Sequence, residues 1–253
     1  MFTKNKAYRA IVSSDWNECL APCGPFDFIS FNYPQLAMQL ETIFKQYTGN
    51  FISLGEAVGQ IQKLLPAPVT EEQMDAYLDE SFKTYSGVAE LIEWCFRNEI
   101  LIMINTTGMI GYFQRIFAKN LIPRIPVLSA HPMVRYPAKK TDPQQIFDLH
   151  ETGDKGKNTE VVIRSFNIPP DKIIIMGDSG GDGPHFEWGA ARGAFLIGNM
   201  VKPSLKTYCA QKGIAISNQF GISYAAGEAK DPQREMQVNF LDLVPVIEDF
   251  LNH

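Results

Sequence analysis

Residues 173–186 read IIIMGDSGGDGPHF, an apolar run that leads directly into a glycine-rich turn carrying Asp178 and Asp182. A short apolar run bounded by turn residues is typical of a strand buried within a sheet. Glycine allows the backbone to come close to a ligand, and the two carboxylates add negative charge to the same turn. The stretch therefore predicts a buried strand whose carboxyl end carries a binding site.

Further apolar runs have the character of strands, and segments with helical spacing separate them. The runs are residues 7–14, 100–104, 125–129 and 193–198. Apolar residues recur at helical spacing over 88–96 and 110–117, and another helical pattern precedes residue 172. This alternation predicts an α/β fold, a doubly wound Rossmann-like parallel sheet with crossover helices. The segment 129–157 contains three prolines, and no local structure is predicted for it.

Residues 21–87 interrupt the alternation, because no strand pattern is evident there. Amphipathic helices are predicted over 34–47 and 55–65, and residues 70–73, Thr-Glu-Glu-Gln, form a capping-box pattern that begins another helix. We therefore predict two domains, a core of residues 1–20 and 88–253 and a helical cap of residues 21–87 inserted after the first strand.

Composition excludes several classes of protein. The 253 residues are 45% hydrophobic, enough for a substantial core, and their formal net charge is −5. An acidic balance without basic patches argues against binding nucleic acid or an anionic membrane. No apolar run is long enough to cross a bilayer, and the N-terminus has no signal-peptide pattern. We expect a cytoplasmic protein with a small-molecule partner, and the sequence does not indicate its oligomeric state.

Two other kinds of site are excluded by spacing. The cysteines form no CxxC pair, so we interpret them as reduced thiols and expect no zinc site; they are Cys19, Cys23, Cys95 and Cys209. The segment ETGDKGKNTE, residues 151–160, is similar to a P-loop, but Glu151 stands in place of its first glycine. Asn158 stands in place of its Ser or Thr, so the segment is not a nucleotide-binding loop.

Polar residues follow the ends of three predicted strands. Asp15 follows the first strand, Asn105 and Thr106 follow the run 100–104, and Asp178 follows the run 172–176. The carboxyl ends of parallel strands open onto one edge of the sheet, so these side chains are expected to converge. Carboxylates gathered beside glycines suit a hard divalent cation, and the sequence predicts Mg²⁺.

These residues, in this order, resemble the four motifs of the haloacid dehalogenase superfamily, whose members are mostly magnesium-dependent phosphatases. GDSGGD matches the GDxxxD signature of the family, and SSDWNECL places Asp15 at the position of its nucleophilic aspartate. Lys155 lies one helix and one turn before Asp178, like the lysine of the phosphoserine-phosphatase-like branch. That branch also inserts helices after the first motif, and the resemblance covers nearly the whole chain.

The resemblance implies a phosphatase that acts on a small phosphorylated metabolite through an aspartyl-phosphate on Asp15. Lys155 would offset the charge of the transferring group, with Lys157 as the competing candidate two positions later. Thr106, or Asn105 beside it, would match the Ser/Thr that positions the phosphoryl group.

The resemblance also implies the magnesium ligands. Asp15 and Asp178 would bind the ion through their carboxylates, and Asn17 through its backbone carbonyl. Asp182 would be a further ligand or would hydrogen-bond to one.

Asn17 is a departure from the pattern. Phosphatases of the family carry a second aspartate two residues after the nucleophile, and this aspartate protonates the leaving group and then activates water. An amide cannot do this, and general acid–base catalysis commonly contributes about 100- to 10,000-fold. An alternative alignment of the first motif, shifted by two residues, would make Ser13 the nucleophile and Asp15 the acid/base. The residues DWNECL fit the unshifted alignment better.

Two other functions follow from Asn17. Phosphonoacetaldehyde hydrolases resemble the Asp-Trp of the first motif and use a cap lysine as a Schiff base in place of the second aspartate. Lys45, Lys63 and Lys83 are the lysines of the inserted region that we consider for this role. The other alternative is a regulatory protein that binds magnesium and phosphate without turnover.

Overall fold

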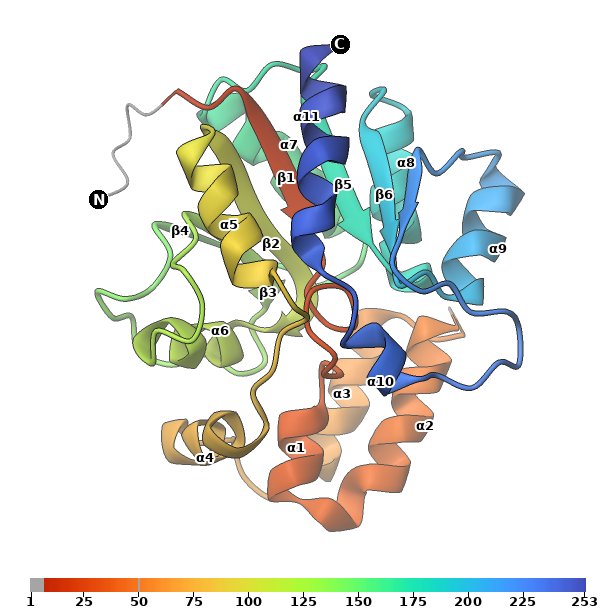
Figure 1. The fold of residues 1–253 in the computed structure, drawn as a ribbon. Helices are drawn as coiled ribbons and strands as arrows, with labels where there is room; N and C mark the ends of the chain where they lie inside the picture. The colour runs from red at the N-terminus through yellow and green to blue at the C-terminus, as the bar shows by residue number, and fades with distance from the viewer. Residues whose placement is uncertain (1–6, 50) are drawn as a thin grey trace.

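The computed structural model describes residues 7–49 and 51–253, and a seven-stranded sheet forms its centre (Figure 1). The strands lie in the order β4-β3-β2-β1-β5-β6-β7, and every neighbouring pair is parallel. Their bounds are β1 Ala10–Ser14, β2 Ile100–Met109, β3 Val127–His131, β4 Gln145–Asp148, β5 Ile173–Gly177, β6 Phe195–Asn199 and β7 Asn218–Phe220. The predicted α/β class and parallel Rossmann-like sheet are confirmed.

The centre of the sheet is formed by the most apolar runs. Every residue of β1, β2 and β5 is buried, because helices cover both faces of the sheet. Val12 of β1 pairs with Ile102 on one side and with Ile174 on the other. The strand order reverses next to β1, and ligands of such sheets bind at the carboxyl ends of the strands at this point.

Six helices cover the two faces of the sheet. They are α5 Val88–Arg97, α6 Ile110–Ala118, α7 Asp154–Ser165, α8 Gly183–Ala190, α9 Pro203–Lys212 and α11 Val244–Asn252. Successive residues of a strand point to opposite faces, so Val12 packs in the apolar cluster that includes α5 and α11. Its neighbour Ile11 packs in the cluster formed with α7, α8 and α9.

Four helices lie together beyond the carboxyl ends of the strands (Figure 1). They are α1 Asp27–Asn32, α2 Ala37–Thr48, α3 Leu54–Leu64 and α4 Glu71–Ser81, all within the interval predicted as the cap. The capping box at the start of α4 is present, since the Thr70 hydroxyl accepts from Gln73 N at 3.3 Å and Gln73 Oε1 accepts from Thr70 N at 3.0 Å. The division of the chain into two domains stays a prediction.

The edge strands were not predicted, and neither were the helices α1, α9, α10 Pro232–Glu235 and α11. β4 lies in the segment 129–157 for which no structure was predicted, and its residues QIFD are half-buried or exposed. β7 has three residues, NQF, with the same character. Strands this short and polar lack the apolar run that marks a buried strand. Within the described residues, every helix is too short or too polar to cross a bilayer.

Candidate active site

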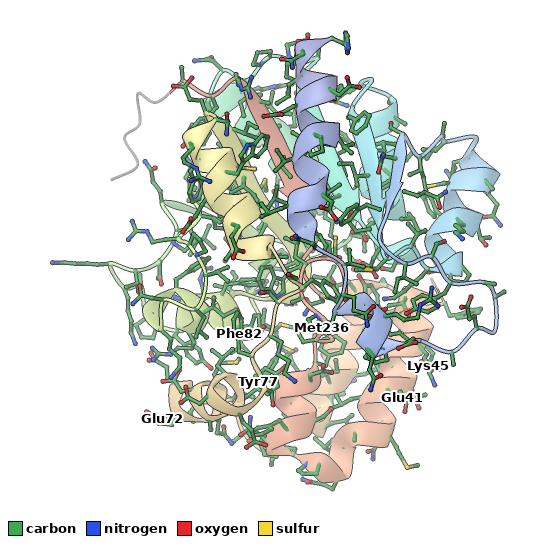
Figure 2. All side chains as sticks on the ribbon, in the orientation of Figure 1. Glu41, Lys45, Glu72, Tyr77, Phe82 and Met236 are labelled. Atoms are coloured by element: carbon green, nitrogen blue, oxygen red, sulfur yellow. The ribbon has the colours of Figure 1, made fainter. Side chains whose placement is uncertain are left out.

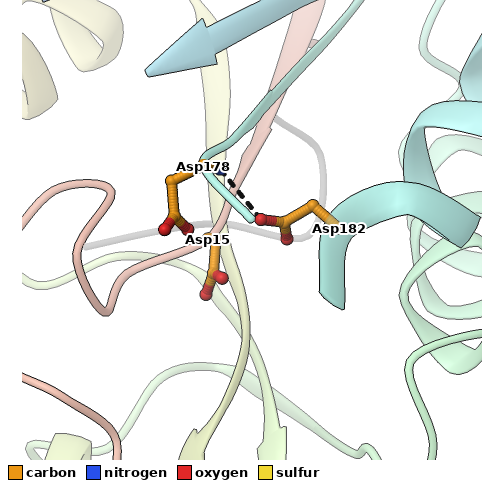
Figure 3. Close-up of side chains that lie close together, drawn as sticks. All are labelled: Asp15, Asp178 and Asp182. Atoms are coloured by element: carbon orange, nitrogen blue, oxygen red, sulfur yellow. Dashed lines mark hydrogen bonds between the residues drawn. The ribbon is translucent and has the colours of Figure 1, made fainter. Parts of the chain in front are cut away.

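Three carboxylates meet where β1 and β5 end (Figure 3). Asp15 follows β1, and its N–H donates to Met176 O at 3.0 Å, which continues the pairing with β5. Asp178 follows β5, and Asp182 ends the 3-10 turn that comes next. One oxygen of each carboxylate lies within 4.8 Å of the others, and all three residues are buried. The structure therefore brings together the carboxylates that the sequence placed at different strand ends.

The glycine-rich turn holds Asp182 under the end of β5. Asp182 Oδ2 accepts from the backbone N–H of Asp178 at 2.9 Å and of Ser179 at 3.2 Å. A Cβ on Gly177 would lie 2.6 Å from Asp182 Cγ, closer than such atoms approach. Glycine at position 177 is thus required by the close approach of the Asp182 side chain to the strand.

Lys155 supplies the positive charge of this cluster. It lies on α7, is fully buried, and places Nζ 2.5 Å from Asp182 Oδ1 and 3.2 Å from Asp15 Oδ2. Lys157, the competing candidate, is exposed and pairs with Asp154 at 2.9 Å. The structure brings Lys155 to the carboxylates and leaves Lys157 outside the cluster.

Burial and neighbouring charges shift the pKa values of the three carboxyl groups in the cluster. Burial raises the pKa of Asp15 to about 6, although Lys155 opposes this shift. Burial also raises the pKa of Asp178 strongly, against the attraction of Lys202. For Asp182, burial acts in the same direction, but the ion pair with Lys155 outweighs it and lowers the pKa. Negative charge is therefore costly at Asp15 and Asp178, where an added cation would stabilise it.

Magnesium fits this donor set. Asp178 Oδ1 is buried and accepts no hydrogen bond from any part of the chain that the structure describes, as expected of an oxygen aimed at a metal. Asp15 contributes a second carboxylate within ligand reach, and Asn17 lines the same cavity. Oxygen donors of this kind are those that Mg²⁺ prefers.

Asn105 and Thr106, adjacent residues of β2, have different surroundings. The Thr106 hydroxyl donates to Asn17 Oδ1 at 3.2 Å, and Thr106 is close enough to the Asp15 carboxyl to lower its pKa. Asn105 points the other way, and its Nδ2 donates to Lys155 O at 2.9 Å and to Thr159 Oγ1 at 3.0 Å. Thr106 is thus beside Asp15, whereas Asn105 holds the helix turn that carries Lys155.

Ser13 lies away from the cluster. Its hydroxyl is fully buried, 3.0 Å from Thr159 Oγ1, and it receives the Asn105 amide at 3.1 Å. The alternative frame with Ser13 as nucleophile therefore has no geometric support, whereas Asp15 lines the cavity.

Both ends of the Asn17 amide are engaged. Oδ1 accepts from Thr106, and Nδ2 donates to Cys23 O at 3.3 Å and lies 3.6 Å from Cys23 Sγ. A Cβ on Gly108 would come within 2.7 Å of Oδ1, so the backbone of β2 closes in on the amide. The side chain is held in one orientation at the edge of the site.

A chain of charged residues that sequence reasoning missed extends from Asp178. Lys202 Nζ lies 2.7 Å from Asp178 Oδ2 and also bonds Glu18, and Lys230 Nζ lies 2.7 Å from Glu18 Oε1. Lys230 Nζ also lies 3.5 Å from Oε2 of the buried Glu235. These residues come from distant parts of the chain and form no motif, so no sequence signal could have identified them.

The cavity above Asp15 is small, with a volume of about 20 Å³. Its lining residues are Asp15, Asn17, Glu18, Pro25, Phe44, Tyr47, Thr48, Thr107, Asp178, Ser179, Gly181 and Lys202. A space of this size holds about one water molecule, so the cap is closed over the site. Thr107, which hydrogen-bonds to Tyr47, was also missed, because the motif pointed to its neighbours.

The cap lysines do not reach this cavity. Lys45 pairs with Glu41 at 2.7 Å on α2, and both side chains are largely exposed on the outside of the cap (Figure 2). Lys63 and Lys83 are exposed as well, and neither lines the cavity. Asp27, which follows the first motif, accepts from Gly24 N at 2.7 Å and lines a neighbouring pocket instead.

Comparison with known proteins identifies the fold. No family model and no curated protein sequence matches the chain. A structure described as a phospho-aspartyl intermediate analogue of phosphoserine phosphatase matches with a TM-score of 0.67 and 13% identity, over 94% of this chain and 99% of that one. A substrate-bound phosphoserine phosphatase complex matches with a TM-score of 0.65 and 14% identity, over 94% and 98% of the two chains.

A haloacid dehalogenase family hydrolase from Salmonella enterica serovar Typhi matches with a TM-score of 0.64 and 14% identity, over 98% of this chain and 74% of that one. At such identities the similarity concerns the fold. The chain has the fold of these phosphoserine phosphatase and haloacid dehalogenase structures, and the expected resemblance is confirmed at the level of the fold.

Proposed function

We propose that this protein is a magnesium-dependent phosphatase that hydrolyses small phosphate monoesters through an aspartyl-phosphate on Asp15. The observation that carries the proposal is the buried cluster of Asp15, Asp178 and Asp182 around Lys155, at the reversal point of a sheet with this fold. A cluster of this kind unites a nucleophile, a cation and metal ligands in one place.

The reaction would proceed in two steps. An Asp15 carboxylate oxygen attacks phosphorus, the bond from phosphorus to the leaving oxygen breaks, and an alcohol or alkoxide departs. Water then attacks phosphorus, the bond to Asp15 breaks, and phosphate leaves. Lys155 offsets charge on the transferring group, and the Thr106 and Thr107 hydroxyls lie where they could orient it.

The proposed metal site uses residues of the first and fourth motifs. A bound magnesium ion would offset the charge of the phosphoryl oxygens and help to align them with Asp15. Its ligands would be the carboxylates of Asp15 and Asp178 and the backbone carbonyl of Asn17, with Asp182 as a ligand or a hydrogen-bonded neighbour.

The cap would control access. A cavity of about 20 Å³ cannot hold a phosphate ester, so α2 and its neighbours must move to admit substrate and close again before reaction. The partner is a small phosphate ester, and the cytoplasmic location stays a prediction.

The test is phosphate release from a panel of small phosphate esters, with magnesium and with a chelator. We expect release that needs magnesium, disappears in Asp15→Asn and persists in Lys157→Met, whose lysine is exposed. Release that survives both the chelator and Asp15→Asn would contradict the proposal.

Asn17 supports one alternative, a protein that binds magnesium and phosphate without turnover. Its signature would be magnesium-dependent phosphate binding by a wild-type protein that hydrolyses no ester, together with activity in Asn17→Asp. The Schiff-base hydrolase has no corresponding observation, since no lysine of the described cap residues lines the cavity.

A further inference from the structure

We propose that this site acts on phosphate esters whose leaving group departs without being protonated, and that aryl phosphates are the class that its cap side chains fit. The inference rests on the proposed phosphatase function and adds the chemical nature of the substrate. Two independent observations carry it: none of the described lining residues offers a carboxyl group free to protonate the leaving group, and the cap side chains that line the cavity are uncharged.

The position of the family's general acid cannot donate a proton to the leaving group. Asn17 is an amide, and its Nδ2 is directed to Cys23 while its Oδ1 receives the Thr106 hydroxyl. The acidic residues lining the cavity are Asp15, Asp178 and Glu18. The first is the nucleophile and the second a metal ligand, so Glu18 is the remaining carboxyl to consider.

Both carboxylate oxygens of Glu18 are already bonded to lysines. Lys202 bonds its Oε2 and Lys230 lies 2.7 Å from its Oε1, so each oxygen faces an ammonium group. Both carboxylate oxygens are thus occupied by lysines, and neither is free to bond to a leaving group. The other polar groups of the wall are the Lys202 ammonium, which is bonded to both Asp178 and Glu18, and the hydroxyls of Tyr47, Thr48, Thr107 and Ser179. An ordinary lysine ammonium is a weak acid at neutral pH, with a pKa of about 10. Hydroxyls are weak acids at neutral pH, about 10 in pKa for an ordinary tyrosine.

The leaving group must therefore carry its own negative charge. A phenol has a pKa near that of tyrosine, about 10, whereas an alkyl alcohol is a much weaker acid, comparable to water. On attack by Asp15, the bond from phosphorus to the aryl oxygen breaks, its electron pair stays on that oxygen, and the phenolate takes a proton from solvent. Without a general acid, an alkyl ester would have to expel a far more basic oxygen.

The cap wall fits the same class. Pro25, Phe44 and Tyr47 face the cavity from the cap, and Phe44 packs edge-on against Phe26 with ring centroids 6.2 Å apart. The described cap residues offer no charged side chain there. Glu18, the carboxylate nearest to them along the chain, has both oxygens occupied by lysines and cannot receive an ammonium group. The cap side of the cavity thus offers no charged partner to a zwitterionic leaving group such as serine and presents rings to an aromatic one.

The experiment compares phenyl phosphate with benzyl phosphate, two aromatic esters of similar size whose leaving oxygens differ in basicity. We expect wild-type kcat/KM for phenyl phosphate to exceed that for benzyl phosphate by at least about 100-fold. Asn17→Asp should raise benzyl phosphate hydrolysis by about 100-fold and phenyl phosphate hydrolysis much less, so the ratio narrows. Phosphoserine should be a poor substrate of both proteins.

Equal use of benzyl phosphate or phosphoserine by the wild type, or a ratio unchanged in a folded Asn17→Asp, would overturn the inference and leave the phosphatase function standing. No magnesium-dependent release from any ester by either protein would instead overturn the proposed function and the inference with it. The wall is tested separately by Phe44→Ala, which should raise KM for phenyl phosphate about tenfold. Met38→Ala, on the exposed side of the same helix, should leave it unchanged, and equal effects of the two would count against the aromatic wall.

Discussion

The two walls of the cavity differ in the kind of side chain they present. The core side of the cavity carries the charged residues Asp15, Glu18, Asp178 and Lys202. Asp15 pairs with the buried Lys155, and Lys202 pairs with Asp178 and Glu18. The cap wall presents Pro25, Phe44, Tyr47 and Thr48, none of which is charged. Chemistry therefore belongs to the core, and the cap contributes closure and shape.

The largest effect that this comparison predicts is the loss of Lys155. Lys155→Met leaves Asp15 and Asp182 buried without a cation, which should cost about 3–5 kcal/mol of unfolding free energy and lower kcat by about 100- to 1,000-fold. Denaturant unfolding and steady-state kinetics measure the two effects. Lys157→Met, the exposed neighbour, is the control, and similar losses in both variants would refute the role given to Lys155.

The absence of an acid/base at position 17 should also slow the second step of the proposed reaction, the hydrolysis of the aspartyl-phosphate. Without a base at Asn17 to activate water, the aspartyl-phosphate would break down slowly. Rapid mixing with an aryl phosphate should release about one equivalent of phenol in a burst, followed by turnover at least about tenfold slower. Asn17→Asp should shrink or abolish the burst. A linear time course in the wild type would show that hydrolysis of the intermediate is not limiting.

Replacing a glycine with alanine should change the unfolding free energy in opposite directions at Gly177 of the core and at Gly59 of the cap. A Cβ on Gly177 would meet Asp182 at 2.6 Å, so Gly177→Ala should lower the unfolding free energy by about 1–3 kcal/mol. A Cβ on Gly59, within α3, meets nothing within 4 Å, so Gly59→Ala should raise it by about 0.5–1 kcal/mol. Denaturant unfolding of both variants compares them. Destabilisation by Gly59→Ala would mean that α3 packs more tightly around Gly59 than this structure shows.

The smallest effect concerns the contact that joins the walls. The Glu151 carboxylate, on the core, accepts from the first N–H groups of α3, Leu54 at 3.1 Å and Gly55 at 3.0 Å. Glu151→Gln should lower the unfolding free energy by about 0.3–1 kcal/mol and raise KM a few-fold, because the closed cap loses a charged bond. Glu90→Gln, exposed on α5, is the control. Unchanged KM and stability in Glu151→Gln would show that this bond does not hold the cap.

Much of the scaffold was accessible from sequence because its signals are local. The central strands are continuous apolar runs, and Thr70 and Gln73 form a capping box within one helical turn. The edge strands escaped because their residues are few and half exposed, so pairing with a neighbour, rather than their composition, makes them strands.

The sequence by itself determined which residues stand at the strand ends, including Asp15, Asn17 and Asp178, since position after a buried strand and order along the chain are local properties. Only the tertiary structure decided which side chains meet at the carboxylate cluster. It separated Thr106 from Asn105 and Lys155 from Lys157, because adjacent residues in a strand or helix point in different directions. It also brought Lys230 to Glu18 across more than two hundred residues, and pairing over such a separation depends on the folded chain alone.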